Sequence, residues 1–291
     1  MYNTLEQLLR LANDEKLGLW EIVLKSEMSL TGLPESMVFE RLDKHYEVMI
    51  RSASIALFED YSLCYKDSLI SGTAHKQNVY AGKTDTIGGE FINRVMARAL
   101  SCSEVNASMG KICAAPTAGA CGVLPAVLIS VGEKYELERK DILKGLLTAS
   151  GIGAVFMKNA TVSGAEGGCQ AECGVAAAMA SAAAVQMVGG SNEASINAVC
   201  FSIMNCMGLI CDPVAGLVQF PCAQRNASQA VNAVLSADLA LAGMKSIIPV
   251  DEVIEAMYKT GRSLPVELKE TALGGVAATA SAKAIALEIF S

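Results

Sequence analysis

The stretch that decides the fold is residues 175–190, VAAAMASAAAVQMVGG, an apolar run made mostly of alanine with methionine, valine and one glutamine. A helix that crosses a membrane needs about 20 apolar residues, and leucine, isoleucine and phenylalanine favour its insertion. This run is too short and too poor in those residues to span a membrane. Helices rich in alanine and glycine can instead approach one another closely. The run therefore predicts a buried helix in an all-helical core.

The composition of the whole chain supports a helical core. Hydrophobic residues make up 52% of the 291 residues, charged residues 18% and aromatic residues 5%, and the mean hydropathy is +0.37. Alternation with period 2, the pattern of a strand, is rare. The other apolar runs are interrupted by Pro116, Pro125, Asp212, Pro213 and Pro221. We expect a mostly α fold, with one compact domain rich in Ala/Gly helices. An interface with a partner could bury the apolar surface that the core does not.

Helical periodicity outlines the chain. The predicted helices cover residues 4–12, 34–58, 90–100, 251–260 and 264–288. Between residues 61 and 89 the pattern weakens into polar and glycine-containing sequence, which predicts a long surface or active-site loop. The expected organisation is an N-terminal helical lobe (1–60), this loop region (61–89) and a core (90–291).

The net charge and the first residues of the chain indicate which partners and which cellular compartment to expect. The net charge is −7, and no Lys/Arg cluster exceeds two adjacent residues, so nucleic acid is not an expected partner. The first residues, MYNTLE, lack the basic start and apolar segment of a secretory signal, and we expect a cytoplasmic protein. Ten cysteines in a reducing compartment are core thiols, metal ligands or nucleophiles, not a disulfide framework.

The neighbours of the cysteines separate most of them into groups. No C-x-x-C occurs, which removes the commonest zinc, thioredoxin and ferredoxin patterns. Cys169 and Cys173 are four residues apart, a spacing that suits a helical ligand pair but also arises by chance. Five others lie in apolar or helical stretches and are expected to be small buried hydrophobes: Cys64, Cys102, Cys113, Cys200 and Cys206.

Three cysteines lie in short segments that contain glycine or proline: Gly168-Cys169, Cys211-Asp212-Pro213 and Pro221-Cys222. Glycine and proline interrupt helices and leave main-chain N–H groups unpaired. Such groups stabilise the thiolates and sulfides of an iron–sulfur cluster. Ordinary turns show the same context, so the pattern alone leaves both a cluster site and plain turns open.

Four longer segments carry a resemblance to a known family. They are EVNASMG (104–110), APTAGACGVLP (115–125), NATVSGAEGGCQAE (159–172) and NCMGLICDPVAGLVQFPC (205–222), the last followed by Arg225 and Asn226. Together they resemble the iron–sulfur-dependent L-serine dehydratase family, alpha chain. The likeness extends weakly to the N-terminal helices and to residues 273–279.

The resemblance implies a cofactor and a reaction. In the family, three cysteines that correspond to Cys169, Cys211 and Cys222 hold a [4Fe–4S] cluster whose fourth iron faces the substrate. That iron acts as a Lewis acid on the hydroxyl and carboxylate of L-serine. A base then removes the Cα proton, and the 2-aminoacrylate that forms is hydrolysed to pyruvate and ammonia.

Two segments depart from the family pattern. SGTAH (71–75) stands where many relatives have Gly-Gly-Asp-Ala, and Ser281-Ala282, preceded by Ala280, replaces an expected Pro-Thr-Gly. The departures bear on substrate identity and turnover more than on cluster binding. The chain also lacks the N-terminal domain of single-chain relatives, so the resemblance implies a separate beta chain as partner.

Several polar residues are further candidates for the site, each with a structural alternative. Possible substrate-orienting residues are Thr117, Asn159, Ser163, Glu166 and Arg225. Thr117 could instead cap a helix, Arg225 could form a structural salt bridge, and the others could satisfy local backbone groups. His75 or Lys158 could be the base, although Lys158 also reads as a solvated lysine. His45 is expected to be solvated.

Three other functions compete with serine dehydration. A cluster-dependent L-cysteine desulfidase would eliminate sulfide by the same chemistry, and an apolar scaffold subunit would hold no cofactor. A pyridoxal-phosphate dehydratase would need a Schiff-base lysine and a phosphate-binding loop in an α/β setting. The weak strand signals oppose that last alternative.

Overall fold

The computed structural model describes residues 1–58 and 68–291. Within these residues the chain is built from helices, and the only strand-like pairing is a single bridge between Cys211 and Lys269. The prediction of a mostly α fold in one compact domain is confirmed. No helix in this part of the chain is long and apolar enough to cross a membrane.

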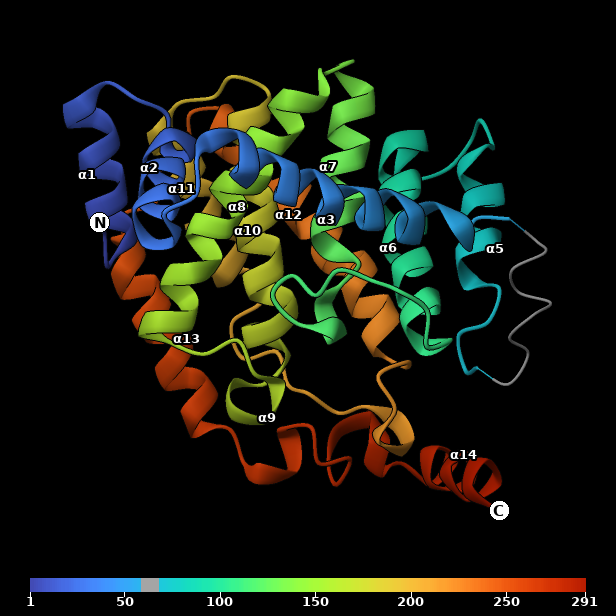
Figure 1. Cartoon of the computed structure of the whole chain (residues 1–291). Coiled ribbons are helices and arrows are strands. Elements are labelled where there is room, and N and C mark those ends of the chain that lie inside the picture. Colours follow the sequence, from blue (N-terminus) through green and yellow to red (C-terminus); the bar gives the residue numbers. More distant parts are fainter. Residues whose placement is uncertain (59–67) are drawn as a thin grey trace.

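Helix α10 (Val175–Met187) lies in the middle of the bundle (Figure 1), and all of its residues except Gln186 are buried. Four helices pack around it: α7 (Val123–Lys134), α8 (Arg139–Asn159), α11 (Asn192–Met204) and α12 (Cys222–Leu241). Small residues permit this close packing, since a Cβ added at Gly145 of α8 would lie 2.6 Å from Cγ of Met187. The alanine-rich run therefore forms the buried helix that its composition predicts.

The first three helices cover one side of the bundle. They are α1 (Leu5–Glu15), α2 (Leu19–Thr31) and α3 (Glu35–Ile55); the periodicity did not predict α2. Leu5 and Leu8 of α1 and Met49 of α3 are buried in the same continuous core as α10. Helix α3 packs against α6 (Gly89–Ala107), α7 and α8.

Helix α5 (Thr73–Ala81) lies inside segment 61–89, so the prediction of a loop is wrong over these residues. Glu104 of α6 caps the start of α5. Its carboxylate accepts hydrogen bonds from the backbone N–H groups of Gly72 (3.0 Å) and Ala74 (2.6 Å) and from the Thr73 hydroxyl (2.9 Å). A cap that comes from a distant helix leaves no local sequence signal.

The predicted closing helix 264–288 is wrong over residues 264–279. This segment is irregular, with short turns of 3₁₀-helix, and only α14 (Ala280–Phe290) is α-helical. Glu270 (φ 63°), Ala272 (φ 57°) and Gly275 (φ 58°) adopt left-handed conformations that end a right-handed helix. The backbone N–H of Glu270 donates to the Cys211 carbonyl oxygen at 2.8 Å, so tertiary pairing replaces helical hydrogen bonds here.

The irregular segments gather at one end of the bundle. Figure 1 shows α9 (Gly164–Gly167), the chain that follows α13 (Val250–Ser263) and α14 together at the bottom of the view. The connection between α11 and α12 reaches the same region, because Cys211 pairs with segment 264–279. This end carries the cysteines discussed below.

Candidate active site

Cys169, Cys211 and Cys222 come from three separate segments and lie close enough together for their charges to interact. Cys169 lies between α9 and a π-helical turn (Gln170–Gly174), Cys211 lies between α11 and α12, and Cys222 begins α12. Cys169 and Cys211 are each 4% exposed, and Cys222 is partly exposed. Burial is the largest cause that raises the pKa of the Cys211 thiol. The negative charges of the Cys169 and Cys222 thiolates raise it further. All nine described cysteines are free thiols.

Backbone geometry fixes the Cys169 segment against the Cys211 segment. Gly168 has φ +75°, and a Cβ at this position would lie 2.7 Å from the Leu209 carbonyl oxygen. The backbone N–H of Gln170 donates to that same oxygen at 3.1 Å. The side chain of Gln170, fully buried, accepts from the Gly208 N–H at 2.8 Å. Glycine is thus required at position 168 for two reasons: its positive φ, and the lack of room for a side chain beside the Leu209 carbonyl oxygen.

Segment 264–279 holds Cys211 from the other side. The Cys211 N–H donates to the Leu268 carbonyl oxygen at 2.9 Å, and the Glu270 N–H donates to the Cys211 carbonyl oxygen at 2.8 Å. This pairing also brings the Glu270 side chain to the cysteines. A continuous helix over 264–288 would not have made these contacts.

Arg225 and Asp212 form a buried ion pair beside the cysteines. Arg225 Nη2 lies 2.6 Å from Asp212 Oδ1, with side-chain exposures of 16% and 1%. Arg225 Nη1 also donates to the Ile210 carbonyl oxygen at 2.9 Å, and Asp212 Oδ2 accepts from the Val276 N–H at 2.7 Å. The guanidinium therefore holds the Cys211 loop against α12. This is the structural salt bridge that was the alternative to a substrate-orienting role for Arg225.

The charge of Arg225 also acts on the thiols. A hydrogen bond with Cys173 is the main cause that lowers the pKa of Cys169, and the nearby Arg225 guanidinium lowers it further. Burial raises the pKa of Cys222 to about 12, and the charge of Cys169 adds to the increase. Three neighbouring thiolates are therefore unfavourable in this space unless positive charge is bound among them.

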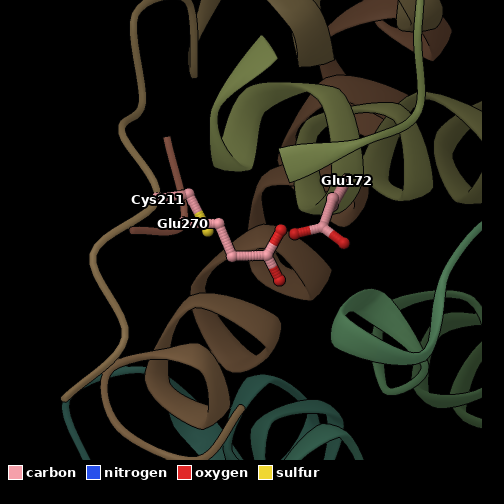
Figure 2. A group of neighbouring side chains, drawn as sticks. All are labelled: Glu172, Cys211 and Glu270. Atoms are coloured by element: carbon pink, nitrogen blue, oxygen red, sulfur yellow. The ribbon is translucent and has the colours of Figure 1, made fainter. Parts of the chain in front are cut away.

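Glu172 is a carboxylate at this site to which the sequence patterns gave no role. Its Oε1 accepts a hydrogen bond from the Thr117 hydroxyl at 2.8 Å. Its carboxylate, the Glu270 carboxylate and Cys211 Sγ offer atoms within 4.8 Å of one another. Figure 2 shows the two carboxylates turned toward each other. Burial is the main cause that raises the pKa of Glu172, and the charge of Glu270 raises it further.

The structure places the remaining candidates around or away from this group. Ser163 precedes α9, and Glu166 within α9 lies 3.8 Å from Nη1 of Arg262 at the surface. Asn159 donates to the Asn3 carbonyl oxygen at 2.7 Å, and Lys158 bonds the Asn3 side chain.

The two histidines lie on other elements. His75 Nδ1, on α5, lies 3.0 Å from the Leu57 carbonyl oxygen. His45, on α3, lines an apolar pocket of about 330 Å³ together with three methionines and Cys113. Among the described residues, neither histidine forms a hydrogen bond with the three cysteines.

The other cysteines mostly follow the expectation of buried thiols. Cys102, Cys200 and Cys206 are 0%, 2% and 5% exposed, and Cys113 is partly exposed. Burial raises the pKa of Cys102 to about 12. Cys64 lies outside the described residues.

Comparison with known proteins shows which protein family this chain is similar to. The family profile described as "Serine dehydratase alpha chain" matches residues 14–277. The "L-serine dehydratase, alpha chain" of Peptoniphilus asaccharolyticus is 46% identical over 98% of this chain and 97% of its own length. The "Probable L-serine dehydratase, alpha chain" of Bacillus subtilis is 40% identical over 100% and 96%. The longer "L-serine dehydratase 2" of Escherichia coli is 35% identical over 95% of this chain but only 61% of its own length.

Proposed function

This chain belongs to the serine dehydratase alpha chain family, and on that premise we propose that it is the catalytic chain of an iron–sulfur L-serine dehydratase. The substrate would be L-serine, and the products would be pyruvate and ammonia. The single observation that carries the proposal is the convergence of Cys169, Cys211 and Cys222, three thiols from three segments, in one largely buried space.

The donor set fits a [4Fe–4S] cluster. Soft thiolates are the ligands that such clusters use, and the raised pKa values of Cys211 and Cys222 mean that bound positive charge would be needed to keep these thiols ionised. Cys169, Cys211 and Cys222 would hold the cluster. With three cysteine ligands, it would supply one iron that acts as a Lewis acid on the substrate hydroxyl and carboxylate.

The residues of the chain would hold and surround the substrate. Arg225 and Asp212 hold the Cys211 loop against the start of α12. Loss of the Cα proton and of the β-hydroxyl gives 2-aminoacrylate, whose tautomer, the imine, hydrolyses to pyruvate and ammonia. Ser163 stays a candidate for orienting the substrate because it adjoins Gly164, which faces Glu172 and Cys211. Glu166, two residues beyond Gly164, stays a weaker candidate because its side chain lies near Arg262 at the surface. Asn159 stays a weaker candidate, since it is bonded to Asn3.

We also propose a separate beta chain as partner. The E. coli relative is longer than this chain, which covers 61% of it. Helix α14 offers an apolar surface for such a partner: Ala282 is its only buried residue, while Leu287 and Phe290 are 75% and 70% exposed. A cytoplasmic location, suited to an oxygen-sensitive cofactor, stays part of the proposal.

The experiment that tests the function is anaerobic reconstitution of the chain with iron and sulfide, together with its beta chain. Pyruvate formation is then measured with L-serine and, separately, with L-cysteine. Faster turnover of L-serine supports the proposal, while preference for L-cysteine would identify a desulfidase. A chain that takes up no iron and turns over neither amino acid would be a scaffold subunit.

A further inference from the structure

The side chain of Gln170 connects three segments that meet at the site. Its Nε2 donates to the carbonyl oxygens of Gly167 and Met257, each at 3.0 Å. Its Oε1 accepts from the Gly208 N–H at 2.8 Å. The side chain is fully buried, so these bonds form away from water, where a lost partner costs more than it does at the surface.

Two of the three partners lie close to cysteines in the sequence. Gly167 precedes Cys169 by two residues, and Gly208 precedes Cys211 by three. Because the amide of Gln170 bonds both segments at once, it holds them at one separation. The spacing between the two thiols therefore depends on this amide.

Helix α13 supports the amide from the third side. Figure 1 shows α13 running from α1 to α9, and it packs against both. At its start, Asp251 accepts from the backbone N–H groups of Leu5 (3.0 Å) and Glu6 (3.2 Å). Near its end, a Cβ added at Gly261 would lie 2.8 Å from Gln170 Nε2. The helix is thus anchored at its start and leaves no room for a side chain beside the amide.

We propose that Gln170 is the residue that positions Cys169 and Cys211 for metal binding, with α13 as its support. The inference rests on the proposed function for the identity of the bound group, an iron–sulfur cluster. Gln170 acts through the backbone of the two cysteine segments, so its role is positioning and not catalysis. Outer-shell partners of this kind typically change metal affinity about 10- to 100-fold.

The test measures Co²⁺ binding by the reduced, cluster-free chain, because thiolates bound to this ion give a charge-transfer absorbance without iron, sulfide or substrate. Gln170→Met keeps the length of the side chain and removes its three hydrogen bonds. We expect it to lower the Co²⁺ affinity at least about tenfold. Iron and sulfide content after anaerobic reconstitution with the beta chain should fall as well. Cys211→Ser should abolish the absorbance, which shows that Co²⁺ reports this site.

Two controls separate positioning from a general loss of stability. Gln186→Met makes the same substitution on α10, where Gln186 Oε1 has no hydrogen-bond partner among the described residues, and should leave the Co²⁺ affinity unchanged. Leu128→Ala removes apolar contacts of a buried residue of α7. It should lower the free energy of unfolding in urea but not the Co²⁺ affinity.

A second variant tests the support from α13 without altering the amide. Gly261→Ala places a Cβ against Gln170 Nε2 and should also lower the Co²⁺ affinity. Gly82→Ala is the matched control, because a Cβ there would have one neighbour within 4 Å, the Val79 carbonyl oxygen at 3.6 Å. Gly261→Ala also decides the question if Gln170→Met does not fold.

Distinct results would overturn the inference. If Gln170→Met binds Co²⁺ as tightly as the unaltered chain, or loses no more affinity than Leu128→Ala, Gln170 does not position the thiols. If Gly261→Ala keeps full affinity, α13 is not the support. An unaltered chain without cobalt–thiolate absorbance would show that the thiols do not act together. If Gln170→Met loses Co²⁺ but the unaltered complex forms no pyruvate, the proposed function fails while the positioning role stands.

Discussion

Replacing Arg225 by methionine should destabilise the chain strongly, because it leaves the Asp212 carboxylate buried without its cation. The Asp212 side chain is 1% exposed and, among the described residues, would keep one hydrogen bond, from the Val276 N–H. Breaking a buried ion pair from one side costs about 3 to 5 kcal/mol. Since Arg225 is 16% exposed and one hydrogen bond to Asp212 survives, we expect the lower end, about 3 kcal/mol.

The assay is urea unfolding of the reduced, cluster-free chain, with the free energy of unfolding extrapolated to water. Arg94→Met is the matched control, because its ion pair with Glu90 is largely exposed and should contribute about 1 kcal/mol or less. Adding Asp212→Asn to Arg225→Met should recover part of the loss, since no unpaired charge then stays buried. A loss for Arg225→Met no larger than that for Arg94→Met would refute the assigned role of the pair.

The remaining predictions concern the cofactor and the partner. Cys169→Ser, Cys211→Ser and Cys222→Ser should each abolish the cluster, because a hard alkoxide replaces a soft thiolate; Cys200→Ser, and Cys64→Ser in the segment outside the described residues, should retain iron. Equal loss in all five variants, or in none, would show that the ligand assignment is wrong. Air should abolish activity faster than it unfolds the protein, as followed by circular dichroism, and anaerobic Fe²⁺ with a thiol should restore it; activity that survives aeration with full iron content would argue against an open iron. The chain alone should be nearly inactive and gain serine turnover when the beta chain is added, so full turnover without a partner would contradict the two-chain proposal.

The parts of the fold that the sequence predicted are those whose signal is local. The alanine-rich run 175–190 and the periodic segments 4–12 and 34–58 became α10, α1 and α3 because each carries its own apolar pattern. Helix α5 was missed because its cap, Glu104, lies on α6. Segment 264–279 was expected to be helical, but its pairing with Cys211 overrides the local propensity.

At the site, too, the sequence predicted features with a local signal and missed those set by distant residues. Glycine or proline lies within two residues of Cys169, Cys211 and Cys222 and marks the helix ends and the loop in which these cysteines lie. Glu172 has no such mark, because its environment is made by Thr117, 55 residues away along the chain, and by the irregular segment that brings Glu270. In the sequence, Glu172 stands out only as the last residue of the stretch NATVSGAEGGCQAE (159–172), which carries the family resemblance.

The most direct test of the central claim is the iron and sulfide content of the anaerobically reconstituted chain, measured beside serine turnover by the same sample with its beta chain. A [4Fe–4S] cluster predicts about four iron and four sulfide per chain, with pyruvate formation that rises in proportion to iron and vanishes in Cys211→Ser. Serine turnover by a sample free of iron, or turnover that persists in Cys211→Ser, would contradict the account.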